Sequence, residues 1–193
     1  MPGYSGPLEQ LAATVREMVD VETSSSILEG IETLGKNAKP ESVALWCKGA
    51  IDRMDRLLDE ESKVRIMNSL GHNCAEKNKR PIQAAARRRS RYKSLSDILE
   101  AEVKKPPRGT RIGLDGDRIL FYYTPNAYRA GLRCYCSLFH GLPPSETASL
   151  TYCNCSKGFV EKYWEAITGG PVAVDLEKSC IAGSTECMFT VHL

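Results

Sequence analysis

Apolar side chains recur every three or four residues through most of the first half of the chain. This spacing places them on one face of an α-helix, so it predicts amphipathic helices that bury one side. We expect helices over residues 7–20, 24–36, 40–58, 60–74 and 94–103. The first hundred residues therefore predict a layer of helices.

Beyond Pro107 the apolar period shortens to two residues, which is typical of β-strands. Asp115-Gly116 lies between two strand-like runs and predicts a tight hairpin turn. We expect a helix over 156–168, and strands over 110–114, 117–123, 132–138, 172–177 and 186–193. On a strand over 132–138, Cys134 and Cys136 would point to the same face.

Together these elements predict an α+β fold, in which an N-terminal helical layer packs on an antiparallel sheet. The helical region covers residues 1–105 and the cysteine-rich α+β region covers 106–193. At 193 residues, the two regions can share one core, and we expect them to form one compact domain together.

The overall composition is that of an ordinary globular protein, with 42% hydrophobic and 26% charged residues and a net charge of +2. The start of the chain lacks the basic and apolar regions of a secretory signal, and no apolar run approaches the roughly 20 residues needed to span a bilayer. We therefore expect a cytoplasmic protein without a membrane contact.

One stretch departs from this balance. Residues 77–93 hold eight Lys or Arg and no acidic residue. A solvated helix face explains this run more simply than an anion-binding surface, because it has one aromatic residue and no recognisable base-reading motif. We accordingly do not expect a nucleic-acid partner.

The cysteines are concentrated in the second half of the chain. Six of the eight lie between residues 134 and 187, and four of these form two Cys-x-Cys pairs. In a cytoplasmic protein such cysteines are more often thiols or metal ligands than disulfides. The pairs could bind one metal, expose a reactive thiolate, or pack as small apolar side chains. Cys47 continues an apolar helical stripe, which favours burial.

The segment from Thr151 to the C-terminus resembles the end of the 4-vinyl-reductase-type ligand-binding domain, which is also the sensing module of bacterial regulators that respond to aromatic compounds. The resemblance rests on Gly158-Phe159, Tyr163, Gly169, Pro171 and Gly183 together with nearby cysteines. In the sensor members, one Glu and three Cys hold a structural zinc. The resemblance implies zinc ligands at Cys153, Glu177, Cys180 and Cys187.

A second resemblance covers about residues 60–193. The two Cys-x-Cys pairs, the Gly71-His72-Asn73-Cys74-Ala75 stretch and the Trp164-Glu165 pair look like uncharacterised prokaryotic proteins related to L-2-amino-thiazoline-4-carboxylate hydrolases. This resemblance does not fix a reaction. If the chain is an enzyme, the candidate catalytic residues are Cys74, Cys134, Cys136, Cys155 and His140.

The leading interpretation is a small-molecule-binding protein with a structural zinc. Domains of the resembled type enclose an apolar and aromatic pocket between helices and sheet, which takes small or hydrophobic ligands. The candidate wall residues are Phe121, Tyr122, Tyr123, Tyr128, Phe139, Tyr163 and Trp164.

Two alternatives to the binding protein stay open. One is a hydrolase for a small amide- or thiazoline-like substrate, which would act through a cysteine or a metal-bound water. The sequence leaves the enzyme question undecided, because it contains none of the common acid/base signatures. The other is a subunit of a larger assembly, such as a homodimer, that uses the N-terminal helices as its interface.

Overall fold

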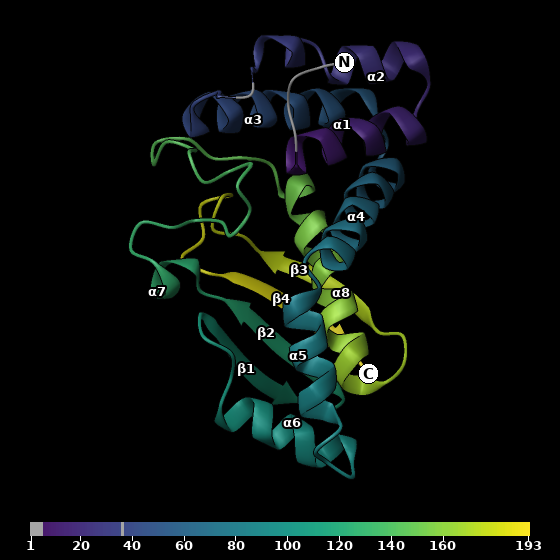
Figure 1. Cartoon of the computed structure of the whole chain (residues 1–193), viewed down its shortest axis with the longest axis vertical. Helices are drawn as coiled ribbons and strands as arrows, with labels where there is room; N and C mark the ends of the chain where they lie inside the picture. Colours follow the sequence, from purple (N-terminus) through teal and green to yellow (C-terminus); the bar gives the residue numbers. More distant parts are fainter. Residues whose placement is uncertain (1–5, 36) are drawn as a thin grey trace.

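The computed structural model describes residues 6–35 and 37–193. Its helices and strands are α1 (Pro7–Met18), α2 (Val21–Ile27), the 3-10 helix η1 (Ile31–Thr33), α3 (Pro40–Leu57), α4 (Glu60–Lys77), α5 (Lys79–Arg89), α6 (Leu95–Lys104), β1 (Thr110–Asp115), β2 (Arg118–Tyr123), α7 (Pro125–Tyr128), the 3-10 helix η2 (Leu150–Cys153), α8 (Asn154–Thr168), β3 (Ala173–Lys178) and β4 (Cys187–His192). Helices α1–α3 lie at one end of the molecule, and α4 leads from them to α8, which packs on the sheet (Figure 1). The predicted α+β class is confirmed.

The N-terminal helices begin where local chemistry favours a start. Proline occupies the first turn of α1 and α3, where its missing N–H would have no helical partner. Asp20 and Asp59 cap α2 and α4 by accepting backbone N–H bonds. The expected helix over 24–36 is shorter than predicted, because α2 ends at Ile27 and Gly30 follows in the left-handed region at φ 78°.

The sheet has four antiparallel strands in the order β1-β2-β4-β3. Gly116, at φ 62°, lies in the tight turn between β1 and β2, as the Asp115-Gly116 pair predicts. Alternate side chains of the strands are buried and form a core with α5, α6 and α8. The strand residues of this core are Ile112, Ile119, Phe121, Val174, Phe189 and Val191.

The predicted strand over 132–138 is wrong. Residues 129–149 form turns and bends, and none of them joins the sheet. Arg133 explains part of the difference, because its guanidinium donates to four backbone carbonyls of the surrounding loops. These bonds hold the segment in a loop conformation, and the segment forms no ladder hydrogen bonds with a neighbouring strand. The short helix α7 was also not predicted.

Two glycines let α4 and α8 approach each other closely. A Cβ on Gly71 would overlap the backbone of Cys155, and a Cβ on Gly158 would overlap Asn68. The absence of both side chains brings the end of α4 against the start of α8, where four of the cysteines gather. Within residues 6–35 and 37–193, no helix is long and apolar enough to cross a membrane.

Candidate functional site

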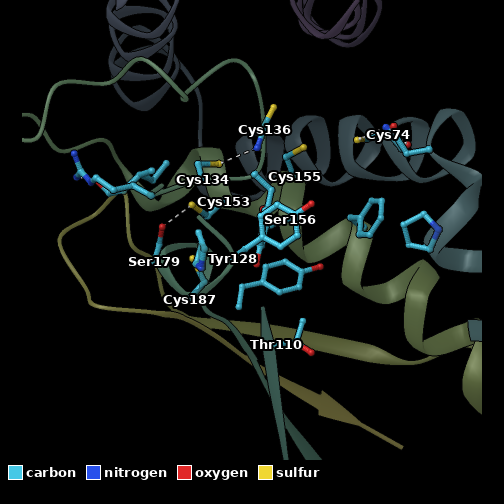
Figure 2. A pocket seen from close by; sticks show the side chains of 18 of the residues that line it. Cys74, Thr110, Tyr128, Cys134, Cys136, Cys153, Cys155, Ser156, Ser179 and Cys187 are labelled. Atoms are coloured by element: carbon cyan, nitrogen blue, oxygen red, sulfur yellow. Dashed lines mark hydrogen bonds between the residues drawn. The ribbon is translucent and has the colours of Figure 1, made fainter. Parts of the chain in front are cut away.

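A cavity of about 720 Å³ lies between α4, α8, the sheet and the loop that precedes η2. Its walls include six of the eight cysteines: Cys74, Cys134, Cys136, Cys153, Cys155 and Cys187. In Figure 2, Cys134, Cys136, Cys153 and Cys155 lie near one another although they come from separate segments, and Cys74 is drawn apart from them on α4. The concentration of cysteines along the sequence therefore corresponds to a concentration in space.

Four of the wall thiols form an inner group, which we call the inner thiols: Cys74, Cys134, Cys136 and Cys155. Cys74 comes from α4 and Cys155 from the first turn of α8, while Cys134 and Cys136 come from the loop. The backbone N–H of Cys136 donates to the Cys134 sulfur at 3.4 Å, and Asn78 Nδ2 donates to the Cys74 sulfur at 3.3 Å. All four are half-buried.

Burial affects the protonation of three of the inner thiols. It raises the pKa of Cys134, Cys136 and Cys155, and charge repulsion between neighbouring thiols adds to the effect for each. These three thiols are therefore neutral at pH 7. A neutral thiol is a poor nucleophile, so Cys134, Cys136 and Cys155 lie in an environment that disfavours their reactive form.

The expected base, His140, does not line the cavity. Its Nε2 lies 2.9 Å from the carbonyl oxygen of Tyr135. His72, from the Gly71–Ala75 stretch, instead pairs with Glu161 of α8 at 2.8 Å. Neither side chain is among the residues around the inner thiols, so the structure does not assemble a Cys–His pair from these candidates.

A second sulfur group lies where α8 meets the β3–β4 connection. Cys153 Sγ lies 2.9 Å from Ser179 Oγ, and the backbone N–H of Cys180 donates to Cys187 Sγ at 3.3 Å. Hydrogen bonds from Cys180 lower the pKa of Cys187 to about 7, against the opposing effect of burial. The pKa of Cys180 rises, because its thiol donates to Cys187 and is partly buried. Burial raises the pKa of Cys153 to about 12.

The expected zinc ligands are only partly assembled. Cys153, Cys180 and Cys187 lie in this second group, but Glu177 is exposed and accepts from Thr190 Oγ1 at 3.0 Å. Across the described part of the chain, no group of three or more His, Cys, Asp or Glu side chains is placed to hold a metal ion. The four residues as they stand do not fit the closed tetrahedral site of a structural zinc.

The rest of the wall is largely aromatic. Four of the seven predicted wall residues line the cavity: Phe121, Tyr123, Tyr128 and Tyr163. Phe139 and Trp164 are packed in the cores instead, and Tyr122 is absent from the lining. Three further aromatic wall residues were not predicted from the sequence, namely Tyr135, Tyr152 and Phe159. These three residues lie within a few positions of the Cys-x-Cys pairs in the sequence, and this closeness is the signal from which they could have been predicted.

Charge is nearly absent from the cavity wall. Among the described residues, Arg108 and Arg133 are the ones of the wall that carry a basic side chain, and none of the lining is Asp, Glu, Lys or His. The Arg133 guanidinium is occupied by backbone carbonyls, and Arg108 lies over the Tyr128 ring, 5.1 Å from its centroid. Apart from these arginines and Cys187, whose lowered pKa of about 7 leaves it partly ionised at pH 7, the described wall offers mainly aromatic faces, thiols and hydroxyl groups.

Comparison with known proteins does not establish a family. No protein-family model and no curated protein sequence matches the chain. Among solved structures, the chain is similar to the crystal structure of the phenol-responsive sensory domain of the transcription activator PoxR with phenol. The identity is 14% and the TM-score 0.41, over 98% of this chain and 91% of that one. A similarity at this level assigns neither a family nor a function to the chain.

Proposed function

We propose that the chain binds a small, mainly apolar molecule in the cysteine- and tyrosine-lined cavity. The observation that carries this proposal is the cavity itself, since about 720 Å³ lies within the roughly 300–1,000 Å³ typical of small-molecule sites. Its position between the helices and the sheet matches the pocket that the resemblance to 4-vinyl-reductase-type domains implies.

The chemistry of the wall restricts the ligand. A charged ligand would lose its hydration on entry, and the described wall offers few charged partners. An anion would find Arg108, because Arg133 is bonded to backbone carbonyls, and a cation would find the partly ionised Cys187. Edge-on aromatic rings offer apolar surface, as in the Tyr123–Tyr135 and Tyr128–Tyr135 contacts. An uncharged molecule with aromatic or aliphatic surface fits this wall best.

Binding of a neutral fluorescent probe, N-phenylnaphthylamine, tests the proposal. Ser156 lines the cavity and is labelled in Figure 2, so a Ser156→Phe variant places a bulky ring inside it. We expect the wild-type protein to enhance the fluorescence of the probe, and the Ser156→Phe variant to lose most of that enhancement. Small uncharged ligands would then be found by displacement of the probe.

A Ser96→Phe variant provides the matched control, because Ser96 is exposed on α6 and is not a wall residue. It should keep the enhancement of the wild-type protein. Equal enhancement by all three proteins would mean that the probe binds elsewhere. Failure of the wild-type protein to bind the probe or any uncharged displacer would count against the proposed function.

The structural zinc stays a prediction from the resemblance. Ser179 and the Cys180 amide satisfy two of the sulfurs in the structure, so zinc binding would require Glu177 to turn away from Thr190. Elemental analysis of protein purified without chelator tests it. About one zinc per chain, lost in Cys153→Ser and kept in Cys134→Ser, would support these ligands; no metal in any sample would contradict them.

The hydrolase alternative has less support. The pKa values of Cys134, Cys136 and Cys155 are raised, and His140 lies outside the cavity wall. A nucleophilic cysteine needs a lowered pKa or an adjacent base. Cys134, Cys136 and Cys155 are therefore not activated for nucleophilic attack at pH 7, and His140 is not placed as their base, which favours the binding proposal.

A further inference from the structure

The run of positive charge over residues 77–93 forms an exposed surface on α5 and its two ends. We call it the basic face, and it consists of Lys77, Lys79, Arg80, Arg87, Arg91 and Lys93. All six side chains are exposed, and none of them forms an ion pair with a residue of the described chain. The two remaining cations of the run are engaged, Arg88 with Glu102 and Arg89 with the Tyr92 carbonyl.

Helix geometry keeps the basic face continuous. Arg80 and Arg87 are seven residues apart, nearly two helical turns, so they lie on the same side of α5 about 10 Å from each other. Ala85 lies on the opposite side, where it is fully buried against α8. Helix α5 is thus fixed by its apolar side and directs its charged side to solvent, on the outside of α8 (Figure 1).

The charge of this face contrasts with the rest of the chain. The run holds eight of the 26 basic residues and none of the 24 acidic ones, which leaves 18 basic against 24 acidic residues elsewhere. The net charge of the whole chain is small because a strongly basic surface is balanced by an excess of acidic residues elsewhere. Unpaired cations held close together repel one another, and a polyanion relieves this repulsion when it binds.

The sequence alone does not favour a nucleic-acid partner, but the exposed cations without ion pairs change that expectation. We propose that the basic face binds the phosphate backbone of nucleic acid, without reading its sequence. Arginine suits phosphate because its planar guanidinium donates two parallel hydrogen bonds. Tyr92, which is 36% exposed between Arg91 and Lys93, supplies an aromatic surface on which an unpaired base can stack. This inference does not depend on the proposed small-molecule ligand.

A membrane fits this face less well than nucleic acid. A helix that lies in a bilayer surface inserts an apolar side between the lipids. The apolar side of α5 is already used, since Ala85 is buried and Ile82 packs against the same core. The solvent-facing side of α5 therefore offers mainly positive charge to a partner, and a regular array of phosphates complements that charge.

Fluorescence anisotropy with a short labelled DNA duplex and a labelled single-stranded RNA, measured at increasing NaCl, tests the proposal. Each phosphate contact contributes roughly −0.9 to the slope of log K against log salt for duplex DNA. With about four to six contacts, we expect a slope of about −4 to −5. Arg80→Gln with Arg87→Gln should reduce the slope by about 2 and weaken binding at least about tenfold.

The control removes the same charge elsewhere. Arg56 and Arg65 are exposed on α3 and α4, so Arg56→Gln with Arg65→Gln should leave affinity and slope near the wild-type values. Three results would overturn the proposal: no binding of either nucleic acid at low salt, equal losses in the two double variants, or tighter binding to phosphatidylserine vesicles than to either nucleic acid at equal ionic strength. Circular dichroism confirms that each variant is folded.

Discussion

At the scale of single residues, two glycines determine how closely α4 and α8 can pack. Gly71 and Gly158 let two helix backbones meet, and this contact determines where Cys74 and Cys155 lie relative to each other. Cysteines at the same positions in the sequence would face different surroundings if α4 and α8 were held farther apart. The cavity therefore depends on residues that do not line it as well as on those that do.

A Gly71→Ala substitution tests this dependence. Its Cβ would overlap the carbonyl oxygen of Cys155, and backbone cannot move aside as a flexible side chain can. We expect the free energy of unfolding to fall by about 1–3 kcal/mol, as for other overpacked sites. Denaturant titration measures this change. Gly170→Ala is the control, because no atom lies within 4 Å of its Cβ, and an undiminished stability of Gly71→Ala would contradict the close approach.

At the scale of elements, the starts of α2 and α4 are each set by a capping aspartate, Asp20 and Asp59, and neither aspartate lines the cavity. The Asp59 carboxylate accepts bonds from both the backbone N–H and the hydroxyl of Ser62 at the start of α4. These bonds, led by the backbone bond, hold the pKa of Asp59 below its usual 3.8. The carboxylate also lies at the positive end of the helix dipole, which favours its charged form.

Removal of this cap should therefore have a pH-dependent effect. Because the pKa of Asp59 is lowered in the folded protein, its contribution to stability is present above pH 3.8 and is lost as the pH falls through the lowered value. We expect Asp59→Ala to lower Tm at neutral pH, and the difference from the wild-type protein to shrink in acid. Asp117→Ala, in an exposed turn, should show neither effect. A difference that persists at low pH would argue against the capping role.

The predicted elements were confirmed where local signals were strong. Amphipathic spacing located α1, α3, α4 and α8, and the Asp-Gly turn located the β1–β2 hairpin. The loop over 129–149 could not be predicted, because its conformation depends on the distant carbonyls that Arg133 contacts, such as those of Cys180 and Ile181. A strand-like pattern of alternating residues carries no information about such partners.

At the scale of the whole molecule, helix α5 is tied to the cavity at both ends. Asn78, where α5 begins, donates to the carbonyl oxygen and the sulfur of Cys74. Arg88, in the last turn, donates to the hydroxyl of Tyr163 at 2.6 Å and to the carboxylate of Glu102. Cys74 and Tyr163 both line the cavity. Helix α5, which carries part of the basic face, is thus joined to the cavity wall by direct hydrogen bonds.

The Arg88–Glu102 pair should be important for stability. The Glu102 side chain is only 3% exposed, so Arg88→Met would leave a buried carboxylate without its cation. We expect a loss of about 3–5 kcal/mol in the free energy of unfolding. The double variant Arg88→Met with Glu102→Leu should recover much of that loss, because it removes both charges. If the double variant is no more stable than the single one, the pair is not the cause.

The sequence by itself determined the parts of this protein that depend on near neighbours: the amphipathic helices, the caps, the hairpin, the α+β class and the clustering of cysteines. These features follow from local backbone preferences and from the period of apolar residues. Tertiary structure decided which cysteines share a wall, that His140 lies outside that wall and that Glu177 bonds to Thr190. It also decided that, of the eight cations of the basic run, only Arg88 forms an ion pair within the described chain. Those outcomes depend on contacts between residues far apart in the chain, which no local pattern specifies.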